Sequence, residues 1–299
     1  MSSVEDQVCY SFPVNAKALC EHQTALGKAK VNRRSLRSKN DLAFFHPEGK
    51  RVPWFPSMLV VGRPNVGTRE TFNRYMDTIW ASRIFTNNGP LVQKFEARLR
   101  EYLEVQHVVV FVNGTIALEA LFSTLPKSGE ILVPSFTFVA TVHAIMRAGH
   151  TPVFCDVDPV TLCVDPAAVQ RGATEKTVAV VGVHLYGAVC DVESLTRVAR
   201  KLRVPLFFDA AHAFGCSIKG VKIGSFGNAE MLSFHATKFF HSIEGGAITT
   251  TDAAIATAVS KIRSYGMTGK FDDDRTPVHA CWGSNGKMSE VSAAMGLTN

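Results

Sequence analysis

Residues 178–209 read VAVVGVHLYGAVCDVESLTRVARKLRVPLFFD, and the pattern in this stretch decides the fold class. Two apolar runs, VAVVGV (178–183) and LFF (206–208), are short, continuous and rich in β-branched or aromatic side chains, which predicts buried strands. Between them, residues 192–202 carry apolar side chains at helical spacing, so we expect a helix there. A strand, a helix and a strand in this order predict parallel strands joined by a right-handed crossover.

The same alternation continues in both directions along the chain. Further strands are expected at 108–112, 131–133, 153–155, 231–234 and 247–250, and further helices at 116–125 and 138–148. Continuous apolar strands separated by helices predict an α/β fold, a mostly parallel sheet covered by helices on both faces. We expect one large domain over residues 56–265 and a loop and helix over 266–299.

Composition excludes several classes of protein. The chain has 299 residues, 46% hydrophobic and 19% charged, which excludes a largely disordered or fibrous chain. No run of about 18 apolar residues occurs, so no membrane span is expected. The seven cysteines are scattered without a Cys-x-x-Cys pair, which predicts a reducing compartment, the cytoplasm, and no structural metal.

Much of the net charge of +6 precedes residue 51, in a leader that we place at residues 1–55. A basic leader is compatible with a nucleic-acid or membrane arm or with a transit peptide. Glu5, Asp6 and Glu21 argue against a transit peptide, because such peptides are poor in acids. With few apolar residues, the leader is expected to be solvated and poorly ordered, with no nucleic-acid or membrane partner.

In a parallel sheet the chemistry gathers at the carboxyl ends of the strands, which selects a candidate site. The polar residues that follow the expected strands are 113–115, 135–137, His184, Asp209 with His212, and 233–238.

Asn113, Gly114 and Thr115 lie between a strand and a helix, where helix N–H groups can bind a phosphate. The alternative is an ordinary turn in which Asn or Thr caps the helix. Neither a Walker motif nor a Gly-x-Gly-x-x-Gly after a strand is present, which argues against a P-loop nucleotidase and a dinucleotide dehydrogenase.

Asp209 ends an apolar strand, and Lys238 follows a later strand in the largely apolar and glycine-rich segment SFHATKFFHSIEGG (233–246). A buried carboxylate needs a cationic partner, and a desolvated lysine amine can form a Schiff base. Taken singly, each residue also has an ordinary interpretation, as a turn cap for Asp209 and as a surface lysine for Lys238.

Together these features match what pyridoxal phosphate (PLP) requires. A lysine holds its aldehyde carbon, an aspartate keeps the pyridine nitrogen protonated, and an aromatic side chain from the strand end at 135–138 covers the ring. A helix N-terminus with hydroxyl groups binds the phosphate.

Six motifs follow one another along the chain. They are FTNNGPLVQKFE from Phe85, NGTIALEAL from Asn113, VPSFTFVATVHAI from Val133, HLYG from His184, DAAHAFGCSIKGVKIGSFGNAEMLSFHATKFFHSIEGGAITTTD from Asp209, and GSNGKMSEVSAAMGL from Gly283. Together these motifs resemble those of the DegT/DnrJ/EryC1/StrS sugar aminotransferases. The resemblance covers about residues 58–299, and the motifs follow one another in the order expected for the family. It implies a fold type I PLP-dependent transferase, similar to aspartate aminotransferase.

The resemblance implies roles for individual residues. Lys238 is implied to be the Schiff-base lysine and the acid/base, Asp209 the partner of the pyridine nitrogen, and His212 a contact on the phenolic-oxygen side of the ring. Phe138 corresponds to the stacking aromatic residue, and the implied phosphate contacts are Gly114, Thr115 and Ser233. Asn285 matches an asparagine that reaches the neighbouring subunit's cofactor, which implies a homodimer with shared active sites.

Thr86, Asn88 and Tyr186 are weaker predictions for the substrate side, and His235 has either a mechanistic or a packing role. TNNGP (86–90) and SFTFVATVHA (135–144) resemble the branch that aminates C4 of nucleotide-linked 4-keto-6-deoxyhexoses. Relatives that dehydrate sugars replace the lysine with histidine, so Lys238 favours transamination, with glutamate as the expected amino donor.

The chain departs from the family pattern in three places. Residues 1–55 have no recognised counterpart, the loop 270–282 contains an unusual acidic run, and the small C-terminal domain of the family is expected to be absent after residue 299. The alternative hypothesis is therefore a truncated, inactive homologue that keeps the fold and binds PLP or dimerises. A non-enzymatic nucleotide-binding module is a third hypothesis, but it does not explain why Asp209 and Lys238 occur together.

Overall fold

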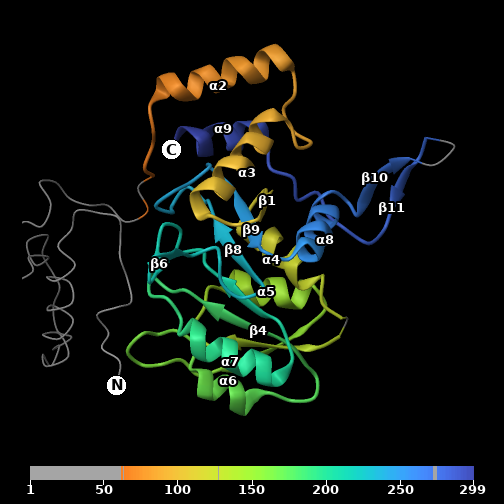
Figure 1. Cartoon of the computed structure of the whole chain (residues 1–299). Coiled ribbons are helices and arrows are strands. Elements are labelled where there is room, and N and C mark those ends of the chain that lie inside the picture. Colours follow the sequence, from red (N-terminus) through yellow and green to blue (C-terminus); the bar gives the residue numbers. More distant parts are fainter. Residues whose placement is uncertain (1–61, 63, 127, 272–274) are drawn as a thin grey trace, which may run out of the picture. The chain divides into compact units, whose positions relative to one another are not determined.

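The computed structural model describes residue 62 and residues 64–126, 128–271 and 275–299 (Figure 1). Residues 64–299 belong to one compact unit, whereas the predicted leader at 1–55 lies outside the described residues. The helices are α2 (Arg69–Ser82), α3 (Pro90–Leu103), α4 (Gly114–Phe122), α5 (Val139–Arg147), α6 (Pro166–Gly172), α7 (Val192–Leu202), α8 (Ala253–Arg263) and α9 (Glu290–Thr298). The strands are β1 (His107–Phe111), β2 (Glu130–Pro134), β3 (Thr151–Cys155), β4 (Thr177–Val183), β5 (Leu206–Asp209), β6 (Ser217–Ile218), β7 (Val221–Lys222), β8 (Ala229–Ser233), β9 (Gly246–Thr250), β10 (Met267–Phe271) and β11 (Pro277–His279).

The main sheet has seven strands in the order β1-β9-β8-β5-β4-β2-β3. The β8–β5, β5–β4, β4–β2 and β2–β3 pairs are parallel, whereas β9 runs antiparallel to both of its neighbours. The predicted mostly parallel α/β sheet is therefore confirmed. Because β9 reverses direction, its first residue, Gly246, lies opposite the last residue of β8, Ser233.

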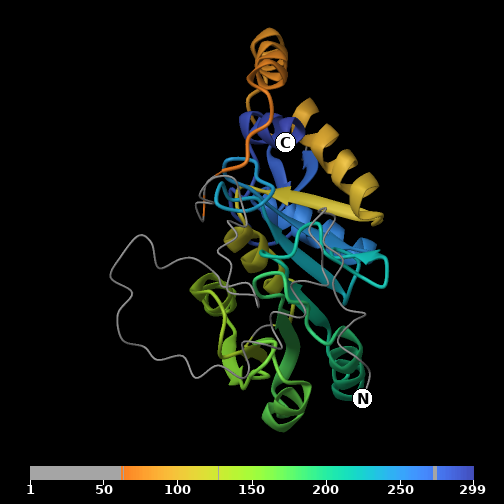
Figure 2. The ribbon, with the colours of Figure 1, turned by 90° about the vertical axis from the view of Figure 1, so that its left-hand side faces the viewer.

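Helices cover both faces of this sheet, as the continuous apolar strands predicted (Figures 1 and 2). On one face, α4, α5 and α8 pack against alternate strand residues such as Phe111 and Phe207. On the other face, α6 and α7 pack against Phe208 and its neighbours, and α3 and α9 pack against Val108 and Val110. The strands are thus shielded from water on both sides, which explains why they are apolar at consecutive positions.

Helix α9 packs into the same core as α3 at the β1 side of the sheet. Gly296 allows this close approach, since a Cβ atom there would lie 2.6 Å from the Phe95 ring. Glu290, 1% exposed, accepts the Leu91 and Val92 amides at 2.8 and 3.0 Å, and so caps the N-terminus of α3. The predicted domain boundary at residue 265 stays a prediction, although residues 290–298 share a core with the preceding domain.

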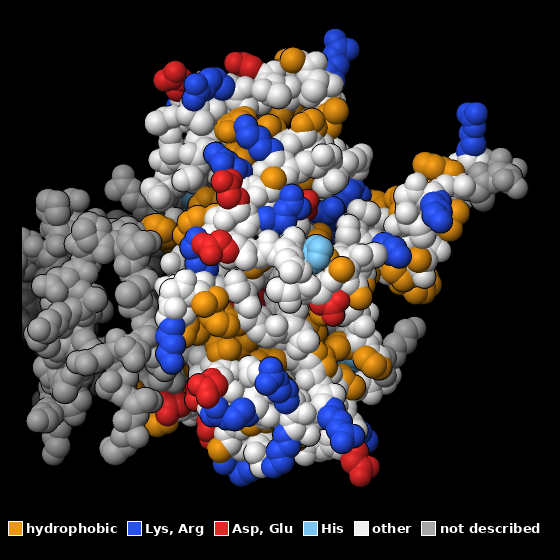
Figure 3. Space-filling model, viewed as in Figure 1, with side chains coloured by type: hydrophobic (Ala, Val, Ile, Leu, Met, Phe, Trp, Pro, Cys, Tyr) orange, Lys and Arg blue, Asp and Glu red, His pale blue; other side chains and the backbone are white. Residues whose placement is uncertain are grey.

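Element boundaries differ from the expected ones by a few residues. The helix expected at 116–125 begins at Gly114, because the Asn113 side chain accepts the Ile116 amide at 2.9 Å and caps the helix there. The loop at 270–282 includes most of a projecting hairpin, β10–β11, with hydrophobic side chains on its surface (Figure 3). Phe271 and Val278 are exposed there.

Candidate active site

The carboxyl ends of β8, β5 and β4 bring the candidate residues to one edge of the sheet. Asp209 pairs in register with Met231 of β8 and with Val183 of β4. Ser233 ends β8 two residues later, and the turn that carries Lys238 follows it. Segments 178–209 and 229–238 therefore meet here because their strands are adjacent and parallel.

Asp209 is nearly buried, with 5% of its surface exposed. Its Oδ2 accepts the Thr141 hydroxyl at 2.7 Å, and its Oδ1 accepts the Ala211 amide at 3.1 Å. Among the described residues it forms no ion pair, in contrast to the partly buried Glu96, which pairs with Arg263. A buried carboxylate that lacks a cation has an unmet need for positive charge, which a protonated pyridine nitrogen would supply.

Lys238 lies in the turn after β8, where its amide donates to the His235 carbonyl at 2.8 Å. The side chain is half-buried, and burial lowers the pKa of its amine below the ordinary value, against the opposing attraction of Asp209. A larger fraction of this amine is therefore neutral at a given pH than for an exposed lysine, as covalent addition to an aldehyde requires.

His212 interacts with both Lys238 and Tyr186. Burial, followed by the positive charge of Lys238, lowers the pKa of its imidazole, which favours the neutral ring. Its Nδ1 accepts the Tyr186 amide at 3.4 Å, which leaves the ring proton on Nε2. The Tyr186 and His212 rings stack at 5.4 Å with an interplanar angle of 9°. Tyr186, predicted for the substrate side, thus contacts a predicted cofactor residue.

The N-terminus of α4 faces the end of β8. Within α4 the Asn113 cap satisfies the Ile116 amide, and the amides of Gly114 and Thr115 have no acceptor inside the helix. A Cβ atom at Gly114 would lie 2.8 Å from the Met231 sulfur and 3.6 Å from Ser233 Cβ. Gly114 is therefore required by packing on β8, and this packing places the helix N-terminus beside Ser233.

Other predicted residues have different surroundings. Phe138 caps α5 and is 70% exposed, so one aromatic face is open to a ligand. Asn285 is exposed, and its neighbour Gly286 accepts the Val112 amide at 2.7 Å, close to the α4 N-terminus. Thr86 is exposed, whereas Asn88 accepts from Arg263 at 3.3 Å, which indicates a structural contact for this side chain.

His235 is exposed, and its Nδ1 lies 2.8 Å from the Thr237 hydroxyl. Its Nε2 lies 3.5 Å from Glu244, on the far side of the same turn. These contacts support the structural interpretation of His235, because they connect the two ends of the turn that carries Lys238.

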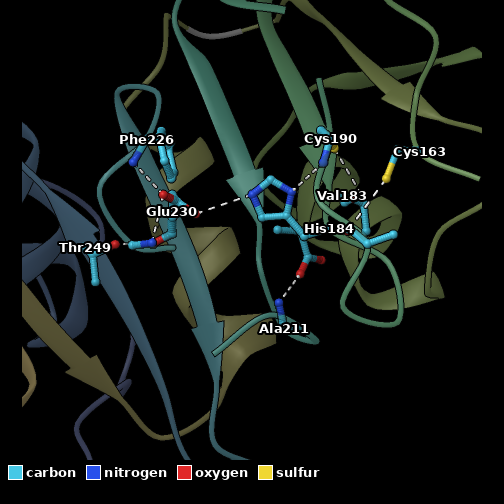
Figure 4. A network of polar contacts seen from close by, with 11 residues as sticks. Cys163, Val183, His184, Cys190, Ala211, Phe226, Glu230 and Thr249 are labelled. Atoms are coloured by element: carbon cyan, nitrogen blue, oxygen red, sulfur yellow. Dashed lines mark hydrogen bonds and ion pairs between the residues drawn. The ribbon is translucent and has the colours of Figure 1, made fainter. Parts of the chain in front are cut away.

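The strand-end prediction was wrong for His184, whose side chain is buried in the core instead. Its Nδ1 accepts the Cys190 amide at 3.2 Å, and its Nε2 faces Glu230 at 3.6 Å (Figure 4). Its ring stacks on Phe208. Both side chains of the His184–Glu230 pair are 0% exposed. Successive side chains along a strand point to opposite faces of the sheet. This alternation directs the side chains of His184 and Glu230 toward the helix-covered face behind Asp209.

Sequence reasoning did not select Thr141, although it lies in the motif SFTFVATVHA (135–144), whereas Thr137 was among the strand-end candidates at 135–137. Thr141 is fully buried and contacts Asp209 directly, and Thr137 contacts Thr141 at 2.9 Å. The available signal was a threonine placed three residues after Phe138, on the first turn of a helix that starts at the same edge of the sheet.

A model of the "DegT/DnrJ/EryC1/StrS aminotransferase family" matches residues 67–299. The chain belongs to this family. It is 40% identical over 239 residues to dTDP-4-amino-4,6-dideoxy-D-glucose transaminase of Shigella dysenteriae, covering 80% of this chain and 64% of that protein. It is 35% identical over 245 residues to L-glutamine:2-deoxy-scyllo-inosose aminotransferase of Streptomyces lividus, covering 78% and 57%.

A crystal structure of DesI in the presence of its TDP-sugar product is similar in fold, with a TM-score of 0.74 and 43% identity. The match covers 82% of this chain and 61% of that one. The chain thus spans less than two thirds of the length of these relatives. Members of the family are PLP-dependent with a type I fold, which confirms the predicted fold and cofactor.

None of the helices in the described part of the chain is both long enough and apolar enough to cross a membrane.

Proposed function

We propose that this protein binds PLP at Lys238 and transfers an amino group from glutamate to a nucleotide-linked keto-deoxy sugar, at C4. The observation that carries the proposal is the pair formed by Asp209, which is buried and has no ion pair among the described residues, and Lys238, which is half-buried with a lowered pKa. The two groups interact electrostatically across one edge of the sheet. The named activities of the relatives support the sugar substrate.

Each residue has a task in this proposal. Bound PLP would supply an electron sink for the α-carbon of the amino acid. Asp209 would hold the proton of the ring nitrogen through its remaining lone pairs, and His212 would donate its Nε2 proton to an oxygen of the ring. The amides of Gly114 and Thr115 and the Ser233 hydroxyl would bind the phosphate.

Lys238 has the second task of moving a proton. Its amine is neutral more often than an exposed amine, so Nζ can accept a proton from the α-carbon and return it at the next position. The exposed face of Phe138 would cover the ring from one side and exclude water from it.

A labelling experiment tests the cofactor assignment. The purified protein is incubated with PLP, reduced with borohydride and mapped by mass spectrometry, and the label is expected on Lys238. The matched control is Lys287, whose amine also has a pKa lowered by burial but which lies over the Tyr265 ring at 4.3 Å. Lys287→Arg should keep the label and Lys238→Arg should lose it. A label on Lys287, or no label, would refute the assignment.

A second experiment tests the reaction. Glutamate and glutamine are added separately to the PLP-loaded protein, and the change in visible absorbance is followed. A response to glutamate supports the proposed donor, whereas a response to glutamine alone would replace it. A protein that carries the Lys238 label but responds to no donor would favour the alternative, a homologue that binds the cofactor without turnover.

The acceptor is tested with three ketones, namely a dTDP-linked and a GDP-linked 4-keto-6-deoxyhexose and 2-deoxy-scyllo-inosose. Product mass and position of the new amine distinguish them. Amination of the dTDP sugar at C4 is the expected outcome, and amination of the carbocyclic ketone alone would refute the nucleotide-sugar substrate.

We further propose a homodimer in which Asn285 reaches the cofactor of the second subunit. Support comes from the exposure of Asn285 and from the contact of its neighbour Gly286 with Ile116, where a Cβ atom would lie 3.1 Å from the side chain. Sedimentation of the PLP-loaded protein should give twice the monomer mass of 32.6 kDa. A monomer that still binds PLP would refute the shared site.

The predicted cytoplasmic location is also a proposal. Its support is that the described cysteines, of which Cys155, Cys163, Cys190 and Cys216 are buried and Cys281 is exposed, are all free thiols. Fractionation of the source cells, with immunodetection of the chain, tests the location.

A further inference from the structure

The Asp209 carboxylate is held by a chain of two threonine hydroxyls at the start of α5. Thr141 Oγ1 lies 2.7 Å from Asp209 Oδ2, and Thr137 Oγ1 lies 2.9 Å from Thr141 Oγ1. Thr141 is 0% exposed, whereas Thr137 is half-buried and nearer to the open side. These hydrogen bonds therefore run from the surface of the site to the buried carboxylate.

The hydroxyl hydrogens of Thr137 and Thr141 have one well-formed arrangement. An ionised carboxylate only accepts hydrogen bonds, so Thr141 must donate its single hydroxyl hydrogen to Asp209. Thr137 must then donate to Thr141. The reverse direction would need a protonated Asp209 and would send the Thr137 hydrogen to the Phe138 carbonyl, at a poorer 3.5 Å. With an ionised Asp209, both hydroxyl hydrogens are therefore used in the two contacts that lead to the carboxylate.

Thr141 also departs from the usual behaviour of a helical threonine. A buried hydroxyl in a helix commonly donates to the carbonyl four residues earlier. Thr196 does so to Val192 at 2.7 Å, and Thr298 does so to Ala294 at 2.7 Å. Thr141 instead donates across to β5, which indicates that its hydroxyl serves the carboxylate rather than its own helix.

The other contacts of Asp209 show which part of its carboxylate Thr141 holds. The Ala211 amide binds Oδ1, and the Asp209 carbonyl accepts the His184 amide at 2.9 Å. The backbone and one oxygen are thus fixed by main-chain groups, and Thr141 is the side chain that fixes the second oxygen. With both oxygens held, the carboxylate plane has one orientation, and its free lone pairs point in defined directions.

We propose that Thr141 is a positioning residue, which orients the Asp209 carboxylate toward a protonated ring nitrogen, and that Thr137 orients the Thr141 hydroxyl. The inference rests on the proposed function, because it requires PLP at Lys238. It assigns Thr141 no contact with the substrate or the cofactor.

The test compares variants that remove or keep the hydroxyl. Thr141→Val replaces the hydroxyl with a methyl group of similar size, Thr141→Ser keeps it, and Thr137→Val removes the outer hydroxyl only. A matched control is Thr250→Val, which removes a buried hydroxyl bonded to the Asn228 carbonyl at 2.6 Å, at the opposite end of β9 from Gly246. The affinity for PLP and the pH at which the visible band of the bound cofactor changes are measured for each protein.

Thr141→Val should weaken PLP binding about tenfold, because a hydrogen bond to a charged group is lost. It should also shift the pH of the spectral change, while Thr141→Ser stays within about twofold of the unchanged protein in affinity. Thr137→Val should give a smaller shift in the same direction, and Thr250→Val should alter thermal stability without moving the spectral pH.

The outcomes separate the two proposals. If the unchanged protein takes no label at Lys238, the proposed function fails and this inference fails with it. If the label forms but Thr141→Val matches the unchanged protein in affinity and spectral pH, only the positioning role is refuted. Should Thr141→Val fail to fold, Thr137→Val decides, and an unshifted spectral pH in that variant refutes the hydroxyl chain.

Discussion

The ion pair between Glu96 and Arg263 allows a quantitative test of how burial sets the strength of a charge pair in this protein. Glu96 on α3 and Arg263 at the end of α8 lie 2.8 Å apart, with their side chains 14% and 7% exposed. Arg263 also donates to the Val110 carbonyl at 2.9 Å, so the pair connects two helices to β1. Glu96→Ala removes the carboxylate and leaves the guanidinium buried without a countercharge.

The structure supplies a control pair of almost equal geometry but different burial. Arg98 and Glu101, also on α3, lie 2.9 Å apart with side chains 67% and 70% exposed. Breaking a buried pair by removing one partner costs about 3–5 kcal/mol, and the partial exposure of Glu96 places our expectation near 3 kcal/mol. Glu101→Ala should cost about 0.5 kcal/mol or less, because water screens the exposed pair.

Urea unfolding followed by far-UV circular dichroism measures both free energies of unfolding. The double variant Glu96→Ala/Arg263→Leu should be more stable than the sum of the single effects, by about 2 kcal/mol, since it removes the uncompensated charge. If Glu96→Ala costs no more than Glu101→Ala, or if the double variant shows no such recovery, burial does not govern this pair and the reasoning is refuted.

Three further outcomes follow from individual residues. Because burial lowers the pKa of Lys238, the rate of covalent PLP addition should rise with pH, with a midpoint below the ordinary 10.5. Stopped-flow absorbance measures this rate, and a midpoint at or above 10.5 contradicts the assignment. Burial raises the pKa of the Cys155 thiol from 9.0 to about 11, so the folded protein keeps a proton that the unfolded chain loses as the pH rises above 9.0. The free energy of unfolding should then fall over this range by at most about 2 kcal/mol. Urea unfolding at pH 8 and pH 10 measures the fall, and Cys155→Ala should not show the part of it that the thiol causes. Gly246→Ala should cost about 1–3 kcal/mol, since the new Cβ would lie 2.6 Å from the Gly114 nitrogen, and should also weaken PLP binding. Gly172→Ala is the control, because a Cβ atom there would have its nearest contact at 3.4 Å. Thermal unfolding compares the two variants, and Gly172→Ala should lose no stability.

The fold class could be predicted because its cause is local and repetitive. Continuous apolar runs such as 178–183 and 206–208 cannot occur on a sheet with one wet face, so they require helices on both sides. Strand ends then indicated Asp209 and Lys238, since the edge of a parallel sheet follows from where the runs stop. The family resemblance added the individual roles, which stay proposals for this chain.

Other features could not be predicted, because they depend on which side chain faces which layer after packing. His184 follows a strand like the other candidates, yet alternation directs it into the core toward Glu230. The capping of α3 by Glu290 joins groups that are 199 residues apart in sequence, and no local pattern predicts such a contact.

By itself, the sequence determined the α/β architecture and the edge of the sheet where polar residues gather, and it selected the lysine and aspartate that we propose for pyridoxal phosphate. The tertiary structure decided how these groups are held, because orientation depends on contacts between elements. The Asp209 carboxylate accepts the hydroxyl of a threonine on α5, and the lowered pKa of His212 is caused by burial and by the positive charge of Lys238. Residue types select the chemistry, and packing between distant segments sets the geometry in which it can proceed.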